Sequence, residues 1–288
     1  MVDMVGVGLD RLRILAEGLD HPESVTTGPD GLLYAGGEAG QLYRVDPDTG
    51  AVEQVASTGG FLLGVTVDGA GRIYGCDIVR RAVVRVEPAS GSVSEWSTGP
   101  AGHRMVNPNM TVFDDQGVAY VTESGHWDAA DGCIYRVREG RTEVWTDASH
   151  AFPNGACLDA EGRGLLVAES THDPCLVHIA IEPDGSAGRR RVVARLPGTV
   201  PDGVCLDALG NAYVTCYRPD RVVRVSPSGA VEVLAEDPRG TLLAAPTNAT
   251  FVGPDLRLCV IANLGRWHLT AADFGIPGLP LRYPIPAD

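Results

Sequence analysis

A short phrase of turn and strand residues recurs six times along this chain, at a spacing of roughly 45 residues. In five copies an Asp- and Gly-containing turn leads into an aromatic or aliphatic run, and a glycine closes the turn. Glycine supplies the positive φ that such turns need, and Asp accepts hydrogen bonds from nearby backbone N–H groups. The turn glycines are Gly31, Gly71, Gly117, Gly162 and Gly210, and a sixth, degenerate copy spans residues 252–258. A fixed period of this length predicts a repeat architecture.

Each repeat continues into further hairpin signals. Segments in which polar and apolar residues alternate, such as 41–45 and 221–225, are followed by turns at 46–50 and 226–229 that contain Asp, Pro, Ser and Gly. Four short strands, repeated six times, predict an all-β, six-bladed β-propeller that forms a single domain over residues 1–288. We expect residues 12–15 to add a strand to the last blade, which closes the ring and removes exposed sheet edges. A two-sheet sandwich is the alternative, but it predicts no fixed period.

The charge balance narrows the classes of partner. The chain has 37 acidic and 23 basic residues, a net charge of −14. Nucleic-acid binding requires clustered Lys and Arg, so we expect no nucleic-acid partner. No apolar stretch approaches the roughly 18 residues of a membrane span, so we expect no membrane association. A small-molecule substrate is the expected partner, and the sequence gives no indication of the oligomeric state.

The first residues of the chain and the cysteine pattern indicate the cellular compartment of the protein. Residues 1–5 carry an acid where a secretory signal carries basic residues. The seven cysteines are an odd number and include no C-x-x-C pair, which favours reduced thiols over a disulfide framework. We therefore predict a cytoplasmic protein, in which Cys157 and Cys205 pack between blades rather than act as nucleophiles.

Polar residues recur at one position of the repeat, eight residues before each turn glycine. This position falls early in the innermost strand of each blade. Because equivalent positions of a rotational repeat lie at equal height around the axis, their side chains converge on the channel. The residues are Glu23, Leu63, Asn109, Asn154 and Asp202, with Thr247 or Asn248 in the sixth copy.

The converging carboxylates and carboxamides predict a metal site. Among apolar neighbours such groups are costly to bury unpaired. Asp, Glu and Asn oxygens are the ligands that Ca²⁺ prefers, and the lack of His and Cys in the register disfavours Zn²⁺. We predict that Glu23, Asn109, Asn154 and Asp202 bind one divalent cation, with Ca²⁺ expected and Mg²⁺, Mn²⁺ or Zn²⁺ as alternatives. In the other interpretation, the four side chains hydrogen-bond one another and seal the channel without a metal.

The residues around these positions resemble those of a known family, the SMP-30/gluconolactonase/luciferin-regenerating-enzyme-like lactonases, to which diisopropyl fluorophosphatase is structurally similar. The Asn-Gly pair at 154–155 matches the family's ligand motif, and Pro-Asp-Gly at 201–203 matches a second one. Pro-Glu at 22–23 resembles the family's Glu-Gly-Pro opening in reordered form, and Pro-Thr-Asn at 246–248 resembles its last-blade segment. The resemblance covers nearly the whole chain. It implies a calcium-dependent lactonase with Glu23, Asn154 and Asp202 as metal ligands.

The same resemblance gives Asn109 two possible roles, a fourth ligand as in the phosphatase or a substrate contact as in the lactonases. The family often has Asn-Asp here, with an Arg two residues earlier. This chain has Asn109-Met110, and its nearest arginine is Arg104, five residues before. We take Arg104 as the candidate for the family's basic substrate contact.

The expected mechanism uses the cation as a Lewis acid on a carbonyl or phosphoryl oxygen. Asp202 then either activates water as a general base or attacks directly, as the resemblance implies. The loops at the end where the innermost strands begin should select the substrate, and their aromatic and basic residues fit an anionic or ring-shaped molecule. The candidate substrate contacts are Asn109, Arg104, His126, Trp127, Tyr217 and Trp267.

The leading hypothesis is a metal-dependent hydrolase that opens a lactone or related ester. A lyase or cyclase on the same metal-bearing scaffold is one alternative, and a non-catalytic propeller that binds a ligand or a protein is another. The polar ring weighs against the last, because simple binding needs no channel cation. The sequence lacks a G-x-S-x-G, H-E-x-x-H or Walker motif, so serine-triad and nucleotide chemistry are disfavoured.

Overall fold

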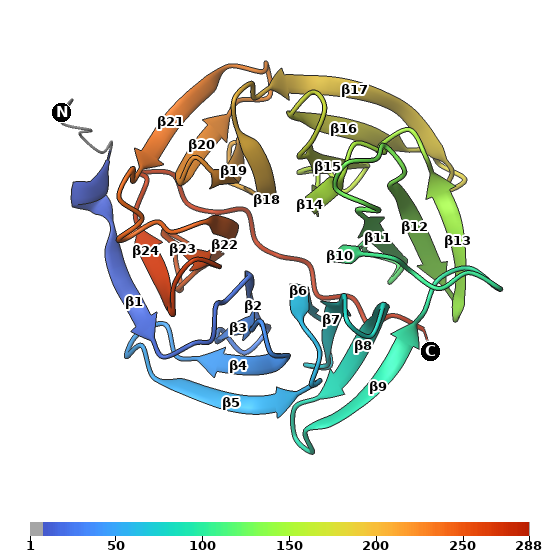
Figure 1. Cartoon of the computed structure of the whole chain (residues 1–288), viewed down its shortest axis with the longest axis horizontal. Coiled ribbons are helices and arrows are strands. Elements are labelled where there is room, and N and C mark those ends of the chain that lie inside the picture. Colours follow the sequence, from blue (N-terminus) through green and yellow to red (C-terminus); the bar gives the residue numbers. More distant parts are fainter. Residues whose placement is uncertain (1–7, 288) are drawn as a thin grey trace.

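Six antiparallel sheets of four strands stand in a ring around a central channel in the computed structural model, which describes residues 8–287 (Figure 1). In each blade the strand nearest the channel is followed outward by the others. This arrangement confirms the predicted six-bladed β-propeller. Residues 1–5, on which the predicted location partly rests, and residue 288 of the predicted domain lie outside the described residues.

The five blades formed by consecutive strands have similar strand lengths. Blades 1 and 2 consist of β2 (Ser24–Thr27), β3 (Leu33–Gly36), β4 (Gln41–Val45), β5 (Val52–Ser57), β6 (Leu62–Val67), β7 (Ile73–Asp77), β8 (Ala82–Glu87) and β9 (Ser92–Ser97). Blades 3 and 4 consist of β10 (Pro108–Phe113), β11 (Ala119–Glu123), β12 (Cys133–Arg138), β13 (Arg141–Thr146), β14 (Pro153–Leu158), β15 (Gly164–Glu169), β16 (Cys175–Ile181) and β17 (Ala187–Arg195). Blade 5 consists of β18 (Val200–Leu206), β19 (Ala212–Arg218), β20 (Arg221–Val225) and β21 (Val231–Glu236).

Blade 6 joins the two ends of the chain. It contains β22 (Pro246–Val252), β23 (Leu258–Asn263), β24 (His268–Ala272) and, outermost, β1 (Arg13–Glu17), which follows the short 3-10 helix η1 (Leu9–Arg11). Strand β1 runs antiparallel to β24, with Arg13 opposite Ala271 and Glu17 opposite His268. The predicted closure by the N-terminal segment is confirmed.

The repeated turns adopt the backbone conformation that their glycines predict. The five turn glycines have φ between 70° and 79°. In the degenerate sixth copy, Leu256 takes this position with φ 53°, so the turn survives without glycine.

The core is divided into layers between neighbouring blades. Each of the six hydrophobic clusters found in residues 8–287 draws its side chains from two adjacent blades. Between blades 5 and 6, for example, the Tyr213 and Phe251 rings pack edge to face with centroids 5.2 Å apart. All seven cysteines are free thiols and all but Cys157 are buried, as predicted. Each blade is therefore stabilised mainly by its neighbours.

The C-terminal segment crosses the channel at the end where the innermost strands finish (Figure 1). Backbone hydrogen bonds connect this segment to blades on both sides of the channel. The N–H of Leu279 donates to the Leu206 carbonyl (2.9 Å), and the N–H of Gly69 donates to the Pro284 carbonyl (3.0 Å). The Tyr283 hydroxyl donates to the Thr27 carbonyl at 3.0 Å. Residues 279–283 and the ends of the inner strands enclose a cavity of about 120 Å³. The C-terminal segment thus covers this end of the channel, and we name the opposite end, where the innermost strands begin, the entrance end.

No helix found in residues 8–287 has both the length and the apolar character needed to cross a membrane.

Candidate metal centre

The innermost strands are bulged where the predicted ligands lie. The strand register shifts between residues 108 and 111, between 153 and 156, and between 201 and 204, which surround Asn109, Asn154 and Asp202. A β-bulge turns a side chain away from the regular alternation between sheet faces. Glu23 occupies the matching place just before β2, where its N–H donates to the Gly36 carbonyl at 3.1 Å. The repeat therefore presents each candidate ligand from an irregular stretch of backbone.

All four candidate ligands are buried, with 5% of Glu23, Asn109 and Asn154 and 6% of Asp202 exposed. Burial raises the pKa of Glu23 well above its usual value, and repulsion from the Asp202 carboxylate raises it further. Burial also raises the pKa of Asp202, an effect that a hydrogen bond from Asn154 opposes. Glu23, Asn154 and Asp202 come from blades 1, 4 and 5, so the ring brings distant residues into electrostatic contact. No cationic side chain within residues 8–287 contributes to either shift.

This donor set fits a hard cation. Asn154 donates from Nδ2 to the Ser170 hydroxyl (3.2 Å), but its buried Oδ1 has no hydrogen-bond partner among the described residues. Buried polar atoms in native proteins nearly always have a partner, so an orphaned amide oxygen is informative. Two buried carboxylates that lack a counter-charge and an amide oxygen that lacks a donor are the oxygen ligands that Ca²⁺ takes.

Glycines beside the ligands let neighbouring inner strands approach closely. A Cβ on Gly155 would lie 2.5 Å from the Asp202 carbonyl oxygen, and one on Gly203 would lie 2.6 Å from the Thr247 carbonyl oxygen. The glycines after Asn154 and Asp202 therefore make room for the innermost strand of the next blade.

The remaining two positions of the register have other uses. Leu63 makes the blade 2 position apolar. In blade 6 the Thr247 hydroxyl donates to the Glu23 carbonyl at 2.5 Å. Asn248 lines the cavity in the channel and accepts a 3.5 Å hydrogen bond from the Val25 N–H. Neither Leu63 nor Thr247 offers the channel a carboxylate.

Sequence reasoning missed a second set of polar residues, which fasten the loops that precede the inner strands. The Glu123 carboxylate accepts hydrogen bonds from the N–H groups of Val106 (2.9 Å), Asn107 (2.6 Å) and Gly125 (3.2 Å). Burial raises the pKa of Glu123, although these donors oppose the rise. Asn263 holds the corresponding loop of blade 6. The signal was present, since Asp77, Glu123, Glu169 and Asn263 all end the second strand of their blades.

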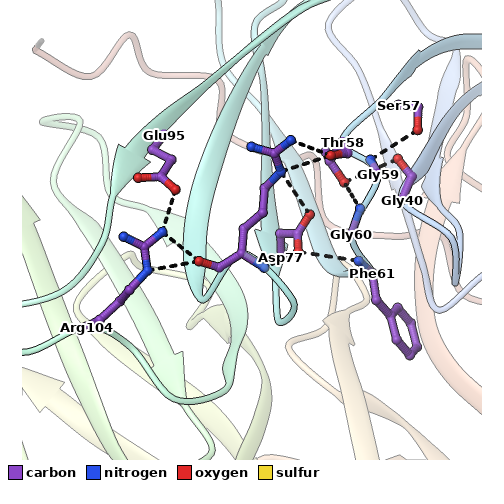
Figure 2. Close-up of polar contacts among 10 residues, drawn as sticks. Gly40, Ser57, Thr58, Gly59, Gly60, Phe61, Asp77, Glu95 and Arg104 are labelled. Carbon is purple, nitrogen blue, oxygen red and sulfur yellow. Dashed lines mark hydrogen bonds and ion pairs between the residues drawn. The ribbon is translucent and has the colours of Figure 1, made fainter.

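Asp77 illustrates this fastening role (Figure 2). Its side chain is buried, and its Oδ1 accepts hydrogen bonds from the N–H groups of Arg80 (2.8 Å) and Phe61 (3.3 Å). The Arg80 guanidinium donates to the Thr58 carbonyl at 2.5 and 2.9 Å. Figure 2 shows the Phe61 ring directed away from these polar groups.

Arg104 lies among contacts with other protein groups. Its guanidinium donates to the Arg80 carbonyl at 2.7 and 3.0 Å and pairs with Glu95 in β9, the outermost strand of blade 2 (Figure 2). Among the contacts that the structure records, none joins Arg104 to the four candidate ligands.

Of the other predicted substrate contacts, His126, Trp127 and Trp267 lie on loops at the entrance end, and Tyr217 lies near the end of β19. His126 is 66% exposed and its Nδ1 lies 2.8 Å from Asp131. Arg218 covers the Tyr217 ring at 4.8 Å from its centroid. Two exposed tryptophans pack against residues that stand two positions before a candidate ligand. The ring centroids of Trp127 and Phe152 are 4.7 Å apart, and those of Trp267 and His21 are 5.1 Å apart.

Comparison with known proteins identifies the family. Residues 22–263, which include all four candidate ligands, match the family model described as the SMP-30/Gluconolactonase/LRE-like region. The chain belongs to this family. The resemblance read from the sequence motifs is confirmed.

This SMP-30/gluconolactonase/LRE-like protein is 27% identical over 271 residues to the 6-deoxy-6-sulfogluconolactonase of Pseudomonas putida, an alignment that covers 86% of this chain and 88% of the relative. It is similar in structure to a gluconolactonase from Xanthomonas campestris, with a TM-score of 0.77 and 22% identity over 92% of this chain and 89% of the other. A calcium-binding regucalcin from Agrobacterium tumefaciens has a TM-score of 0.73 and 15% identity, covering 98% of this chain and 97% of the other. These structural similarities confirm the fold of the family member described here.

Proposed function

We propose that this protein is a metal-dependent lactonase that hydrolyses a lactone or related ester, with one divalent cation, expected to be Ca²⁺, held by Glu23, Asn109, Asn154 and Asp202. The observation that carries the proposal is the pair of buried carboxylates without a counter-charge. The partnerless oxygen of Asn154 supports it. The lactonase relative supports the reaction class, and the calcium-binding relative supports the ion.

The residues present suffice for hydrolysis of an ester bond. A bound divalent cation would supply a Lewis acid that polarises the substrate carbonyl. Asp202 serves as general base: its carboxylate takes a proton from water while the water oxygen bonds to the acyl carbon. The acyl–oxygen bond of the ring then breaks and the proton passes to the departing ring oxygen, so lactone and water become one hydroxy acid. General-base assistance of this kind contributes roughly 10²–10⁴-fold in rate.

Direct attack by the Asp202 carboxylate on the acyl carbon is the other route for the same residue. It forms an ester between substrate and Asp202, which water then hydrolyses. Both routes require Asp202 to be ionised at the moment of attack, and a neighbouring positive charge favours that form.

The test is the Asp202→Asn variant in a continuous acid-release assay with simple lactones. We expect kcat to fall at least 10²-fold while the circular dichroism spectrum is retained. Glu38→Gln is the matched control, because Glu38 is 53% exposed and lies in a loop at the same end of the ring. Turnover by Asp202→Asn near that of the unmodified protein would reject the proposed role.

A second arm tests the metal. Protein treated with a chelator should lose activity and regain it with Ca²⁺, and the same readout compares Mg²⁺, Mn²⁺ and Zn²⁺. Full activity after removal of all divalent ions would contradict the metal-dependent reaction. Absence of turnover with every lactone and every ion would favour a non-catalytic binding propeller.

A further inference from the structure

The entrance of the candidate site has an apolar sector over blades 2 to 4. Val79, Val106 and Trp127, on loops of blades 2 and 3, are 65%, 38% and 48% exposed. Half-buried Phe61 and buried Phe152 each stand two positions before a place in the ligand register. We name Phe61, Val79, Val106, Trp127 and Phe152 the apolar rim.

Hydrogen bonds between the loops hold the blade 2 and blade 3 parts of the apolar rim together. The N–H of Ile78, next to Val79, donates to the Phe61 carbonyl at 3.1 Å. The Arg81 guanidinium, from the same loop, donates to the carbonyl of Met105 at 2.7 Å and so ties it to the residue before Val106. Two residues after Phe61 comes Leu63, which occupies the ligand-register position of blade 2 but carries no oxygen ligand. The apolar rim and the apolar position of the ring therefore coincide in blade 2.

Phe152 extends the apolar rim to blade 4. Its backbone has φ 55°, a left-handed conformation that is a genuine outlier for a bulky residue. The conformation sets the Phe152 ring edge to face with Trp127 of blade 3, with centroids 4.7 Å apart. His21 (φ 43°) and Ala245 (φ 48°), at the matching places in blades 1 and 6, share this backbone conformation. Phe152, two residues before Asn154, thereby supports an exposed tryptophan of the neighbouring blade.

Several basic groups of the neighbouring loops are already engaged by the protein. Arg80 donates to the Thr58 carbonyl, Arg104 pairs with Glu95, and Arg218 pairs with Asp220 at 2.6 Å. Two oxygens at this end that have no hydrogen-bond partner among the described residues, on Asn107 and Thr171, are fully covered by other atoms. A substrate rich in hydroxyl groups needs accessible donors and acceptors, which the apolar rim does not offer, and exposed His126 beside the apolar rim is paired with Asp131.

We propose that the substrate carries an alkyl chain or an aryl ring beside its reacting carbonyl, and that this part rests on the apolar rim. The inference rests on the lactonase function proposed above. It assigns selectivity for hydrophobic lactones over polyhydroxylated sugar lactones, with Trp127 as a specificity-determining residue. Exposed apolar surface grouped around a polar centre is typical of ligand sites.

The test is a series of lactones that share one ring and differ in chain length: δ-valerolactone, δ-hexalactone, δ-octalactone and δ-decalactone, with D-glucono-1,5-lactone as the polar member. Each methylene that leaves water on the apolar rim should raise kcat/KM by about twofold to fourfold. D-Glucono-1,5-lactone should be hydrolysed no faster than δ-valerolactone. A flat profile along the series, or a preference for D-glucono-1,5-lactone, would overturn the inference and leave the lactonase function standing.

Variants locate the effect. Trp127→Ala should lower kcat/KM for δ-decalactone about tenfold and for δ-valerolactone less than twofold, and Trp127→Phe should restore most of the loss. Trp127 is half exposed, so the change should leave the fold intact. Leu209→Ala is the control, because Leu209 is 69% exposed on the turn between β18 and β19, at the covered end of the ring. Equal losses for both lactones in Trp127→Ala would remove Trp127 from the proposed role.

If no lactone is hydrolysed, calorimetry still decides the inference. The probes are 5-hydroxydecanoate and gluconate, titrated separately into the protein with Ca²⁺ present. If 5-hydroxydecanoate binds more tightly than gluconate, and Trp127→Ala weakens its binding, the apolar rim is supported. In that case the missing turnover counts only against the proposed hydrolysis. Tighter binding of gluconate would overturn the inference.

Discussion

Replacing Glu23 by glutamine should change the stability of this propeller in opposite directions with and without Ca²⁺. Glu23 and Asp202 are buried, and their carboxylates repel each other with no cation among the groups that shift their pKa values. An uncompensated ion inside a protein costs several kcal/mol, part of which protonation relieves. Glu23→Gln removes one of the two charges and keeps the shape of the side chain.

In metal-free buffer the variant should be more stable by about 1–3 kcal/mol, the cost of leaving a buried polar group uncompensated. For a chain of this size 1 kcal/mol corresponds to about 2 °C, so Tm should rise by about 2–6 °C. With Ca²⁺ at about 1,000 times its Kd, the unmodified protein should gain about 4.1 kcal/mol. The variant, which lacks a charged ligand, should gain much less, so the order of the two melting temperatures should reverse.

The assay is thermal melting followed by circular dichroism, in a chelator and in Ca²⁺. Glu123→Gln is the control: it is also a buried carboxylate, but it accepts three backbone hydrogen bonds, so its loss should destabilise the protein in both buffers. The Ca²⁺-induced shift of that control should be unchanged. A Glu23→Gln variant that is less stable in chelator and keeps the full Ca²⁺ shift would refute the reasoning.

Three further predictions test the same structure. Because burial raises the pKa values of Glu23 and Asp202, the metal-free folded protein retains protons that the unfolded chain releases. Its stability relative to Glu23→Gln should therefore fall as pH rises above about 4, measured by urea unfolding in chelator, and a relative gain would contradict the pairing. Gly203→Ala should lower the free energy of unfolding by about 1–3 kcal/mol, because its Cβ would lie 2.6 Å from the Thr247 carbonyl oxygen. It should also weaken Ca²⁺ binding in calorimetry. Unchanged stability and affinity would show that the two strands can move apart without cost. Arg282→Ala removes the ion pair with Asp115 at the covered end and should cost about 0.5–1.5 kcal/mol with kcat unchanged, whereas a loss of turnover would link the C-terminal segment to the site.

The sequence predicted the ring, its closure and the candidate ligands because these features follow from a repeat. Eight residues separate Asp202 from Gly210 just as they separate Asn154 from Gly162, so the register could be counted without coordinates. The degenerate sixth copy was harder. Its turn uses Leu256 at positive φ in place of glycine, and its register position is divided between Thr247 and Asn248.

Features that belong to no single repeat could not be counted in this way. The surroundings of Arg104 depend on Glu95 in β9 and on the Arg80 carbonyl, which Arg104 reaches from a loop that is not part of the repeated phrase. The contact between Phe152 and Trp127 joins two blades, and the positive φ that Phe152 shares with His21 and Ala245 at the matching places follows from no residue of the repeated phrase. The loop-fastening role of Glu123 was visible only as an acidic residue at the end of a strand.

The pairing of β1 with β24 sets a constraint on how the protein is made. On the ribosome Arg13 emerges long before its partner Ala271 is added to the chain. Until then the growing chain exposes the edge of β1 and an incomplete circle of blades, both of which invite association with other chains. A product terminated before β24 could never close its circle, so selection against early stops and against slow translation of this last blade should be stronger for this architecture than for one whose units fold independently.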